Sequence, residues 1–345
     1  MDRSLLNAIS RMAPDLMDQL ISRALILERL SLLQPAGRRQ LAQKLGMPER
    51  EARVLTNILR ADGFIDVTAA GMSLSSKAYE IIDTIRDIAS LRTELSTLET
   101  QLQKLLNIER VRIVPGNADT NPDVLEEIGR VAGAQLRRVL EPGMILAVNG
   151  GTTIHSVATN IPRGANMDVT VLPVRGGLGK SAETQASTLA QLIAERLGGH
   201  HEPLYLPDDM PPEVFKELAE RMEGVKRTLD ELHRANVLLY GIARADEMAK
   251  NRLMSPDLID SLLRQGATAE ALGHCFDADG HLLGSASGLG LPEDSFSRIP
   301  VCIAVAAGAH KAAAILAVAR HHKNTLLITD EGAANRIAEL IRKQK

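Results

Sequence analysis

The sequence predicts an α/β protein that carries a small helical domain before its main sheet. Beyond Ile108, short apolar runs alternate with helical patterns, which indicates a mostly parallel sheet with helices on both faces. Two short amphipathic helices around a Gly-Met-Pro turn come earlier, and a leucine-rich helical segment separates the two patterns. We therefore predict a winged helix-turn-helix domain over residues 1–76, a coiled helical linker over 77–107, and a doubly wound domain over 108–345.

The composition excludes several classes of protein. Hydrophobic residues make up 45% of the chain but aromatic residues only 2%, so aliphatic side chains must build the core. No apolar run is long enough to cross a bilayer, and the N-terminus lacks a signal-peptide pattern. Cys275 and Cys302 have no metal-ligand spacing and are expected to be buried. We expect a cytoplasmic protein without a metal site or a membrane partner.

Charge is distributed unevenly along the chain. The formal net charge is −3, yet residues 1–60 hold ten Lys or Arg against six Asp or Glu. A basic segment in an otherwise acidic chain indicates a local surface for nucleic acid.

Residues 38–60 have the pattern of a helix-turn-helix. A short helix is expected over Arg39–Leu45 and a second helix from Glu49. Gly46 suits the left-handed position of the turn, and Pro48 suits the first turn of the next helix. The residues expected to pack the two helices together are Leu41, Ala42, Leu45, Val54, Leu55, Ile58 and Leu59.

The second of these helices presents polar side chains that can enter the major groove of DNA. The strand-like segments Phe64–Val67 and Met72–Leu74 predict a two-stranded wing beside it. A three-helix bundle with a solvated charged face is the alternative interpretation. The expected DNA-contacting residues are Arg38, Arg39, Arg50, Arg53, Thr56, Asn57 and Arg60.

The segment Lys77–Asn107 predicts one long helix with a narrow apolar seam. Charged residues flank the seam, so we favour a coiled coil that pairs two copies of the chain and places two reading helices on two DNA half-sites. An amphipathic helix packed on its own domain is the alternative. The seam consists of Ile81, Thr84, Ile88, Leu91, Leu95, Leu98, Leu102 and Leu105.

Seven apolar runs are candidates for the strands of the sheet, with helical patterns between most of them. The strands are expected at residues 111–114, 145–148, 169–173, 204–206, 237–240, 301–306 and 325–329. Three of the helices are expected at residues 123–140, 184–197 and 311–320. Ligands of such sheets bind at the carboxyl ends of the strands.

The segment Met144–Ala158 is the clearest candidate for a binding site. An apolar strand leads into Gly150-Gly151-Thr152-Thr153, and a helical pattern follows. Glycines let the backbone approach a ligand closely, and the free amides of a helix start, with two threonine hydroxyls, suit a phosphate group. The alternative is a tight strand-to-helix turn with Thr152 as the N-cap.

Basic side chains near the ends of other strands strengthen the phosphate interpretation. Arg175 lies beside a glycine turn, and Lys250 and Arg252 follow the strand expected at 237–240. Lys311 lies at a helix start, where a cation opposes the helix dipole unless an anion is nearby. Solvated cations in surface loops are the alternative.

Other polar residues have structural interpretations. Asp277–Gly280 lacks the closing ligands of a calcium loop and predicts a hairpin turn. Asp330 is expected to cap a helix. His321 and His322 have no partner residues at metal-ligand spacing and are expected at the surface.

Five motifs together carry a family resemblance: Gly37-Arg-Arg-Gln-Leu41, Gly150-Gly-Thr-Thr-Ile154, Pro173-Val-Arg-Gly-Gly-Leu-Gly179, Phe276-Asp-Ala-Asp-Gly280 and Thr329-Asp-Glu-Gly-Ala-Ala334. With them the chain resembles the SorC family of sugar-sensing bacterial repressors over nearly its whole length. The resemblance implies a winged-helix DNA-binding domain, a coiled linker, and an effector domain with a fold like that of sugar-phosphate isomerases and deaminases. It also implies that the chain binds double-stranded operator DNA as a homodimer or homotetramer.

The effector and its contacts also follow from the resemblance. The glycolytic member of the family responds to fructose 1,6-bisphosphate, which implies glycolytic target genes and that ester or a related sugar phosphate as effector, with no cofactor. Two positions depart from the family: Lys250-Asn251-Arg252 stands in place of paired arginines, and His274-Cys275 in place of an aromatic stretch. The residues implied to contact the effector are Gly151, Thr152, Thr153, Arg175, Gly176, Gly177, Leu178, Gln185, Glu270 and Lys311.

Two other functions fit parts of the pattern. A sugar-phosphate isomerase or deaminase would use the same phosphate site, with Asp246, Glu270 or Asp330 as the carboxylate that transfers a proton. No Asp-His-Glu set stands out, however, and a DNA-reading domain argues against an enzyme. A scaffold that uses the coiled helix alone would leave the glycine turns and their cations unexplained. We therefore expect a ligand-controlled regulator of transcription.

Overall fold

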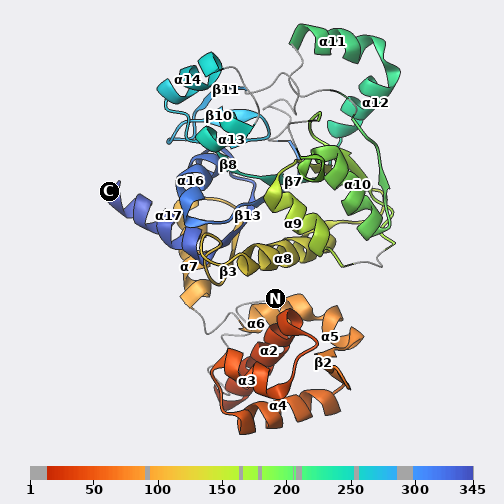
Figure 1. The fold of residues 1–345 in the computed structure, drawn as a ribbon, viewed down its shortest axis with the longest axis vertical. Helices are drawn as coiled ribbons and strands as arrows, with labels where there is room; N and C mark the ends of the chain where they lie inside the picture. Colours follow the sequence, from red (N-terminus) through yellow and green to blue (C-terminus); the bar gives the residue numbers. More distant parts are fainter. Residues whose placement is uncertain are drawn as a thin grey trace. The chain divides into compact units, whose positions relative to one another are not determined.

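The protein contains two compact units, divided between Thr97 and Leu98 (Figure 1). The computed structural model describes residues 14–89, 94–162, 166–177, 181–204, 206, 212–251, 256–285 and 298–344. Each unit has a core of its own aliphatic side chains, as the scarcity of aromatic residues requires.

The first unit is a winged helix-turn-helix built on α2 (Pro14–Leu33). Its other elements are α3 (Arg38–Leu45), α4 (Glu49–Ala61), β1 (Ile65–Thr68), β2 (Gly71–Leu74), α5 (Ser76–Glu80) and α6 (Ile82–Ala89). Strands β1 and β2 pair antiparallel as the wing. Gly46 ends α3 in the left-handed conformation, with φ 62°, which allows the sharp turn into α4. Leu30, Leu41, Leu59 and Ile85 meet in the core, and the prediction of this domain is confirmed.

The prediction of one continuous helix over Lys77–Asn107 is wrong. The segment contains α5, α6 and α7 (Glu94–Leu106), and the backbone leaves the helical conformation at Ile81, with φ −118°. Ile88 is buried in the core of the first unit, where α6 packs on α2, so the alternative interpretation applies to it. An apolar repeat has the same appearance whether it faces a second chain or the chain's own core. Leu91 lies outside the described residues.

The second unit contains a parallel sheet of seven strands in the order β3-β13-β12-β7-β4-β5-β6. Every pairing in this sheet is parallel, which confirms the predicted doubly wound architecture. The strands are β3 (Arg110–Val114), β4 (Ile145–Val148), β5 (Thr170–Pro173), β6 (His200–His201), β7 (Val237–Gly241), β12 (Val301–Val305) and β13 (Leu326–Asp330).

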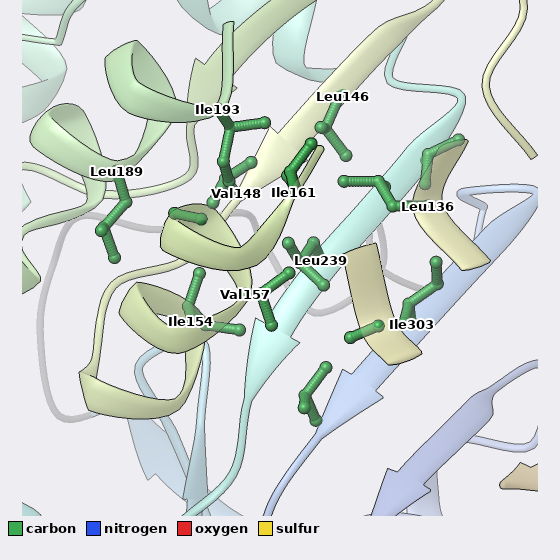
Figure 2. Close-up of a cluster of buried hydrophobic side chains, with 14 of the residues drawn as sticks. Leu136, Leu146, Val148, Ile154, Val157, Ile161, Leu189, Ile193, Leu239 and Ile303 are labelled. Carbon is green, nitrogen blue, oxygen red and sulfur yellow. The ribbon is translucent and has the colours of Figure 1, made fainter. Parts of the chain in front are cut away.

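Helices cover both faces of the sheet. On one face, α8 (Asp123–Val139), α9 (Thr152–Asn160) and α10 (Ala186–Leu197) pack on side chains of β4, β7 and β12 (Figure 2). The chain passes from β12 through α16 (Ala312–His321) to β13 in the opposite direction along the sheet. A right-handed crossover in that direction places α16 on the other face of the sheet. In agreement with this, no residue of α16 belongs to the hydrophobic cluster under α8, α9 and α10.

A second, antiparallel sheet has the order β11-β10-β9-β8. Its strands are β8 (Ala243–Arg244), β9 (Ala269–Ala271), β10 (His274–Phe276) and β11 (Leu282–Ser285). The predicted hairpin turn at Asp277–Gly280 joins β10 to β11 and is confirmed. The remaining elements are η2 (Ala182–Thr184), α11 (Pro212–Arg221), α12 (Glu223–Leu232), α13 (Ala245–Asn251), α14 (Pro256–Arg264), η3 (Ala309–Lys311) and α17 (Glu331–Lys343).

Two local predictions in this unit are wrong. Leu204 and Leu206 are not in a strand; they are buried against Val225 of α12, and packing rather than strand pairing accounts for their apolar pattern. His322 is buried rather than at the surface, and burial, followed by the neighbouring histidines, lowers its pKa to about 3. The ring of His321 packs 4.9 Å from that of Phe276.

Candidate functional site

A cavity of about 400 Å³ lies at the carboxyl ends of β4, β5 and β7. The chain continues from β4 toward β5 on one side and from β7 toward β12 on the other, so the cavity lies at the switch point of the sheet, where ligands of such folds bind. Its volume is within the range of small-molecule sites. The predicted contact residues that line it are Gly151, Thr152, Thr153, Arg175, Gly176, Gln185, Glu270 and Lys311.

The start of α9 supplies main-chain donors to the cavity. Gly151 has φ +119°, a conformation that favours glycine, and its amide donates to the Thr184 carbonyl at 2.8 Å rather than to the cavity. The first intrahelical bond runs from the His155 amide to the Gly151 carbonyl. The amides of Thr152 and Thr153 precede it at the positive end of the helix dipole, and among the described residues neither has a hydrogen-bond acceptor.

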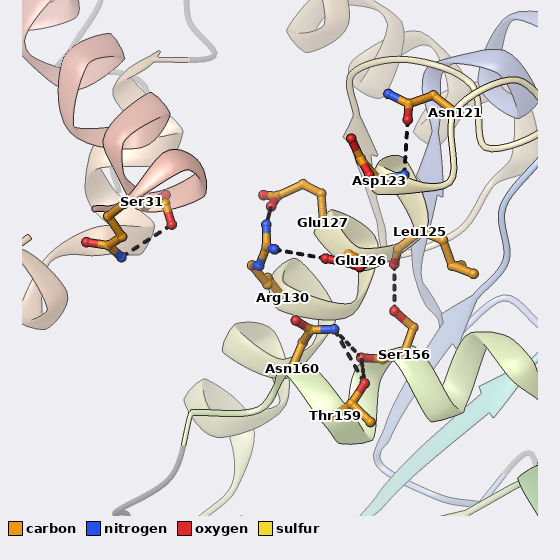
Figure 3. A network of polar contacts seen from close by, with 11 residues as sticks. Ser31, Asn121, Asp123, Leu125, Glu126, Glu127, Arg130, Ser156, Thr159 and Asn160 are labelled. Carbon is orange, nitrogen blue, oxygen red and sulfur yellow. Dashed lines mark hydrogen bonds and ion pairs between the residues drawn. The ribbon is translucent and has the colours of Figure 1, made fainter. Parts of the chain in front are cut away.

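Close packing of α9 on α8 fixes the position of this helix start. A Cβ atom on Gly129 would lie 2.4 Å from the Ser156 carbonyl oxygen, so the two helices could not approach this closely with any larger residue. The Ser156 hydroxyl also donates to the Leu125 carbonyl of α8 at 2.8 Å (Figure 3). The contact at Ser156 lies one turn after the start of α9 and fixes the position of the N-terminal amides of this helix.

Arg175 and Glu270 form a buried ion pair in the wall of the cavity. Arg175 is 1% and Glu270 2% exposed, and Arg175 Nη1 lies 3.2 Å from Glu270 Oε1. The same oxygen accepts the Gly273 amide at 2.6 Å. Buried charges are tolerated when they are paired and hydrogen-bonded in this way. The predicted clamp residue Arg175 therefore already has a carboxylate partner.

Lys311 is the cation of the cavity whose charge is least compensated. Burial lowers its pKa, against the influence of Glu247, Asp119 and Asp330, which raise it. Within the part of the chain that the structure describes, no hydrogen bond or ion pair at contact distance reaches its ammonium group. An anion in the cavity would supply the missing partner.

A buried carboxylate holds the loops around Lys311 together. Asp330 is 0% exposed and accepts the amides of Ala118 at 2.7 Å, Gly308 at 2.9 Å and Ala333 at 3.3 Å. The last of these bonds is the N-cap of α17, so the predicted cap is confirmed. Asp119 in turn accepts the amide and the ring Nδ1 of His310, next to Lys311.

Glu247 lines the cavity, whereas the sequence had indicated its neighbour Asp246. Asp246 instead forms a bidentate pair with Arg244, and that hydrogen bonding lowers the pKa of Asp246. The Glu247 carboxylate lies 3.7 Å from Arg244 Nε and 3.9 Å from His310 Nε2. Glu247 lies in the first turn of α13, directly after β8, and this proximity to a strand end is the one signal in the sequence that could have indicated it.

Of the other predicted effector residues, the structure describes Gly177 in full. The Gly177 amide donates to the Leu206 carbonyl at 2.8 Å, and Gly177 does not line the cavity. Lys250 lies in α13, but its side chain is outside the described part of the structure. Leu178 and Arg252 lie outside the described residues.

Most of the predicted DNA-contacting side chains share one surface of the first unit. Arg50, Arg53, Asn57 and Arg60 of α4 are exposed. Arg38 Nη2 donates to Asn57 Oδ1 at 3.2 Å, and Arg39 pairs with Glu49 at 3.5 Å. The arrangement presents cations around one helix that can enter a groove.

Two residues of α4 lie on faces opposite to those predicted. Thr56 is 2% exposed, and its hydroxyl donates to the Ala52 carbonyl at 2.8 Å, so its assignment as a DNA contact is wrong. Val54 is 53% exposed, so its assignment to the helix–helix core is also wrong. The helix is rotated relative to the predicted pattern because Ala52, Thr56 and Leu59 form the buried stripe.

Each of the two units matches the model of a known protein family. Residues 20–89 match the model of the "CggR N-terminal DNA binding domain", and residues 92–339 match the "Putative sugar-binding domain". The chain is 34% identical to the central glycolytic genes regulator of Bacillus subtilis, over 96% of this chain and 98% of that protein. It is 31% identical to the protein of the same name from Priestia megaterium, over 99% of both.

A solved SorC-family transcriptional regulator from Enterococcus faecalis is 32% identical, with a TM-score of 0.66 over 70% of this chain and 99% of that one. The chain belongs to the SorC family of sugar-binding transcriptional regulators. The full-length SorC regulator of Klebsiella pneumoniae, 18% identical, shares the fold with a TM-score of 0.64 over 92% of this chain and 99% of that one.

Membership of the SorC family makes the chain a DNA-binding regulator with a sugar-binding domain rather than an enzyme. Among the described helices, none is long and apolar enough to span a membrane. In the same residues, no group of three His, Cys, Asp or Glu side chains is arranged to hold a metal ion.

Proposed function

We propose that this protein is a repressor of glycolytic genes whose binding to operator DNA is controlled by a sugar phosphate, with fructose 1,6-bisphosphate as the favoured effector. The names of the two Bacillus and Priestia relatives support the choice of genes. The observation that carries the proposal is the partly desolvated ammonium of Lys311, which lines the same cavity as the first-turn amides of α9. These groups are suited to one phosphate dianion.

The charged residues that line the cavity favour the binding of one phosphate group there rather than two. The lining residues include two cations, Arg175 and Lys311, and two carboxylates, Glu247 and Glu270, and Arg175 is already paired with Glu270. We therefore assign one phosphate to α9 and Lys311. A second phosphate would extend toward the end of α13, where Lys250 lies.

Calorimetric titration with fructose 1,6-bisphosphate, fructose 6-phosphate and inorganic phosphate tests this assignment. The double variant Thr152→Ala, Lys311→Ala is expected to lose measurable binding of both sugar phosphates while its affinity for operator DNA is unchanged. Lys343→Ala removes an exposed lysine of α17 and serves as the charge control. Unchanged binding by the double variant would place the phosphate elsewhere.

We further propose that the repressor acts as a homodimer or homotetramer, because two copies of α4 are needed to read two half-sites. Leu95, Leu98 and Leu105 of α7 are only half-buried in the single chain and remain available for a partner. Sedimentation of the protein with and without a duplex operator measures the stoichiometry. A monomer on the intact operator would refute this part of the proposal.

A further inference from the structure

Val54 is an apolar residue in the middle of the polar face of α4. It is 53% exposed, whereas the buried face of this helix consists of Ala52, Thr56 and Leu59. Helical spacing places Val54 one turn after Arg50 and one turn before Asn57, both of which are exposed. The helix that carries the DNA-binding cations therefore has one hydrophobic spot at the centre of its outer surface.

The polar neighbours of Val54 can form hydrogen bonds with DNA, whereas the apolar side chain of Val54 cannot. Arg50 and Arg53 suit phosphate oxygens or the acceptor edge of guanine. Asn57 Oδ1 accepts a hydrogen bond from Arg38 at 3.2 Å, so its amide N–H groups are what Asn57 offers to a base. The C5 methyl of thymine is the apolar group that the four bases present in the major groove.

We propose that Val54 contacts the methyl group of a thymine and thereby selects that base in each half-site. The contact removes the methyl groups of both partners from water, which stabilises the complex. Cytosine at the same position has no C5 methyl, so Val54 would lose its apolar partner there. The selection acts at the DNA and does not depend on which sugar phosphate fills the cavity.

Replacement of thymine by deoxyuridine, which lacks the C5 methyl, tests the contact directly. The full chain is used to enrich bound duplexes from a random-sequence pool, and each thymine of the enriched half-site is then replaced in turn. We expect one position in each half-site at which the replacement weakens binding roughly fourfold, the effect of one buried methyl group. An enriched half-site without thymine, or equal affinity for all replaced duplexes, overturns the proposal.

Val54→Ala identifies the side chain that senses the methyl. Alanine is a strong helix former and the position is exposed, so the variant is expected to fold. It should bind the thymine and deoxyuridine duplexes equally. The matched control, Val67→Ala, removes a 45% exposed valine from wing strand β1 and should keep the fourfold difference. A difference that persists in Val54→Ala would assign the methyl contact to another residue and overturn the proposal.

Discussion

At the scale of single residues, the buried position of Lys311 favours the neutral amine more than water does. Burial lowers its pKa from the ordinary value of 10.5, and three nearby carboxylates oppose this shift. A phosphate dianion in the cavity would stabilise the charged form and raise the pKa again. The state of this one proton is therefore coupled to occupancy of the cavity.

Effector affinity is expected to fall as pH rises through the lowered pKa of Lys311 in the free protein toward the higher pKa of the complex. In that window the free protein has lost a proton that the complex retains, so binding takes up a proton, and linkage requires weaker binding at higher pH. Calorimetry in two buffers of different ionisation enthalpy measures the uptake. Lys311→Arg, which does not titrate in this range, should abolish it. Proton uptake that persists in this variant would point to another group.

Glu247 is expected to weaken binding of the anionic effector. Its carboxylate lines the same cavity as Lys311, so Glu247→Gln should raise the affinity for a sugar phosphate by about 1 kcal/mol. Glu195→Gln changes the net charge equally on the exposed face of α10 and should leave the affinity unchanged. Titration calorimetry compares the two variants, and weaker binding by Glu247→Gln would mean that the carboxylate accepts a hydrogen bond from the sugar.

Arg53→Ala should weaken operator binding by about 1–3 kcal/mol and lower the salt dependence of the affinity if the contact is to a phosphate. Thr56→Ser, which keeps the internal hydroxyl donor to Ala52, should leave the affinity unchanged because Thr56 is buried. Mobility-shift titrations at several salt concentrations measure both quantities. No loss in Arg53→Ala would remove this face of α4 from the groove.

Residues next to a turn or a strand end were predictable, and residues that depend on helix rotation were not. Thr152, Thr153 and Lys311 follow the ends of β4 and β12 within six residues, so their place at the edge of the sheet is fixed by the local sequence. Val54 and Thr56 lie two positions apart in α4 and therefore on different faces of the helix, and only the packing of the whole unit decides which of those faces is buried. Glu247 had no distinguishing neighbour in the sequence.

At the scale of elements, the contact between α8 and α9 controls where the phosphate donors lie. Gly129→Ala would place a Cβ 2.4 Å from the Ser156 carbonyl and force the two helices apart. We expect the free energy of unfolding to fall by about 2–3 kcal/mol, together with weaker effector binding. Urea unfolding and calorimetry measure the two effects.

Gly224→Ala is the matched control for this substitution. Gly224 lies in the first turn of α12, and a Cβ there would meet no atom within 4 Å. The free energy of unfolding should stay the same or rise by about 0.5–1 kcal/mol, because alanine favours the helix more than glycine does. Equal destabilisation by both alanines would show that the α8–α9 contact adjusts at little cost.

Helices and strands were predicted correctly where their sequence pattern is compatible with only one structure. Six of the seven expected strands are present in the parallel sheet, because a buried parallel strand is a short apolar run and helices follow most of them. The expected strand at residues 204–206 and the long helix over residues 77–107 failed for one reason. An apolar repeat records that a face is covered, but it does not record what covers it.

At the scale of the whole molecule, the two units separate the reading of DNA from the sensing of sugar. The fragment Glu94–Lys345 begins with α7 and contains the whole cavity. It is expected to fold alone and to bind fructose 1,6-bisphosphate with the affinity of the full chain. At one hundred times the dissociation constant, the ligand should stabilise the fragment by about 2.7 kcal/mol. Thermal unfolding of the fragment checks this, and a fragment that folds without binding would refute it.

The three amides gathered by Asp330 have a consequence for how such sensors diversify. The Asp330 carboxylate ties the loops beyond β3 and β12 to the start of α17 through main-chain amides, and Asp330 itself does not line the cavity, so the frame of the pocket is independent of most residues that face the ligand. Glu247, Met248 and Gln185 can then be exchanged with little strain on the frame. A designer who wants a biosensor for another metabolite should keep Asp330 and randomise those three positions.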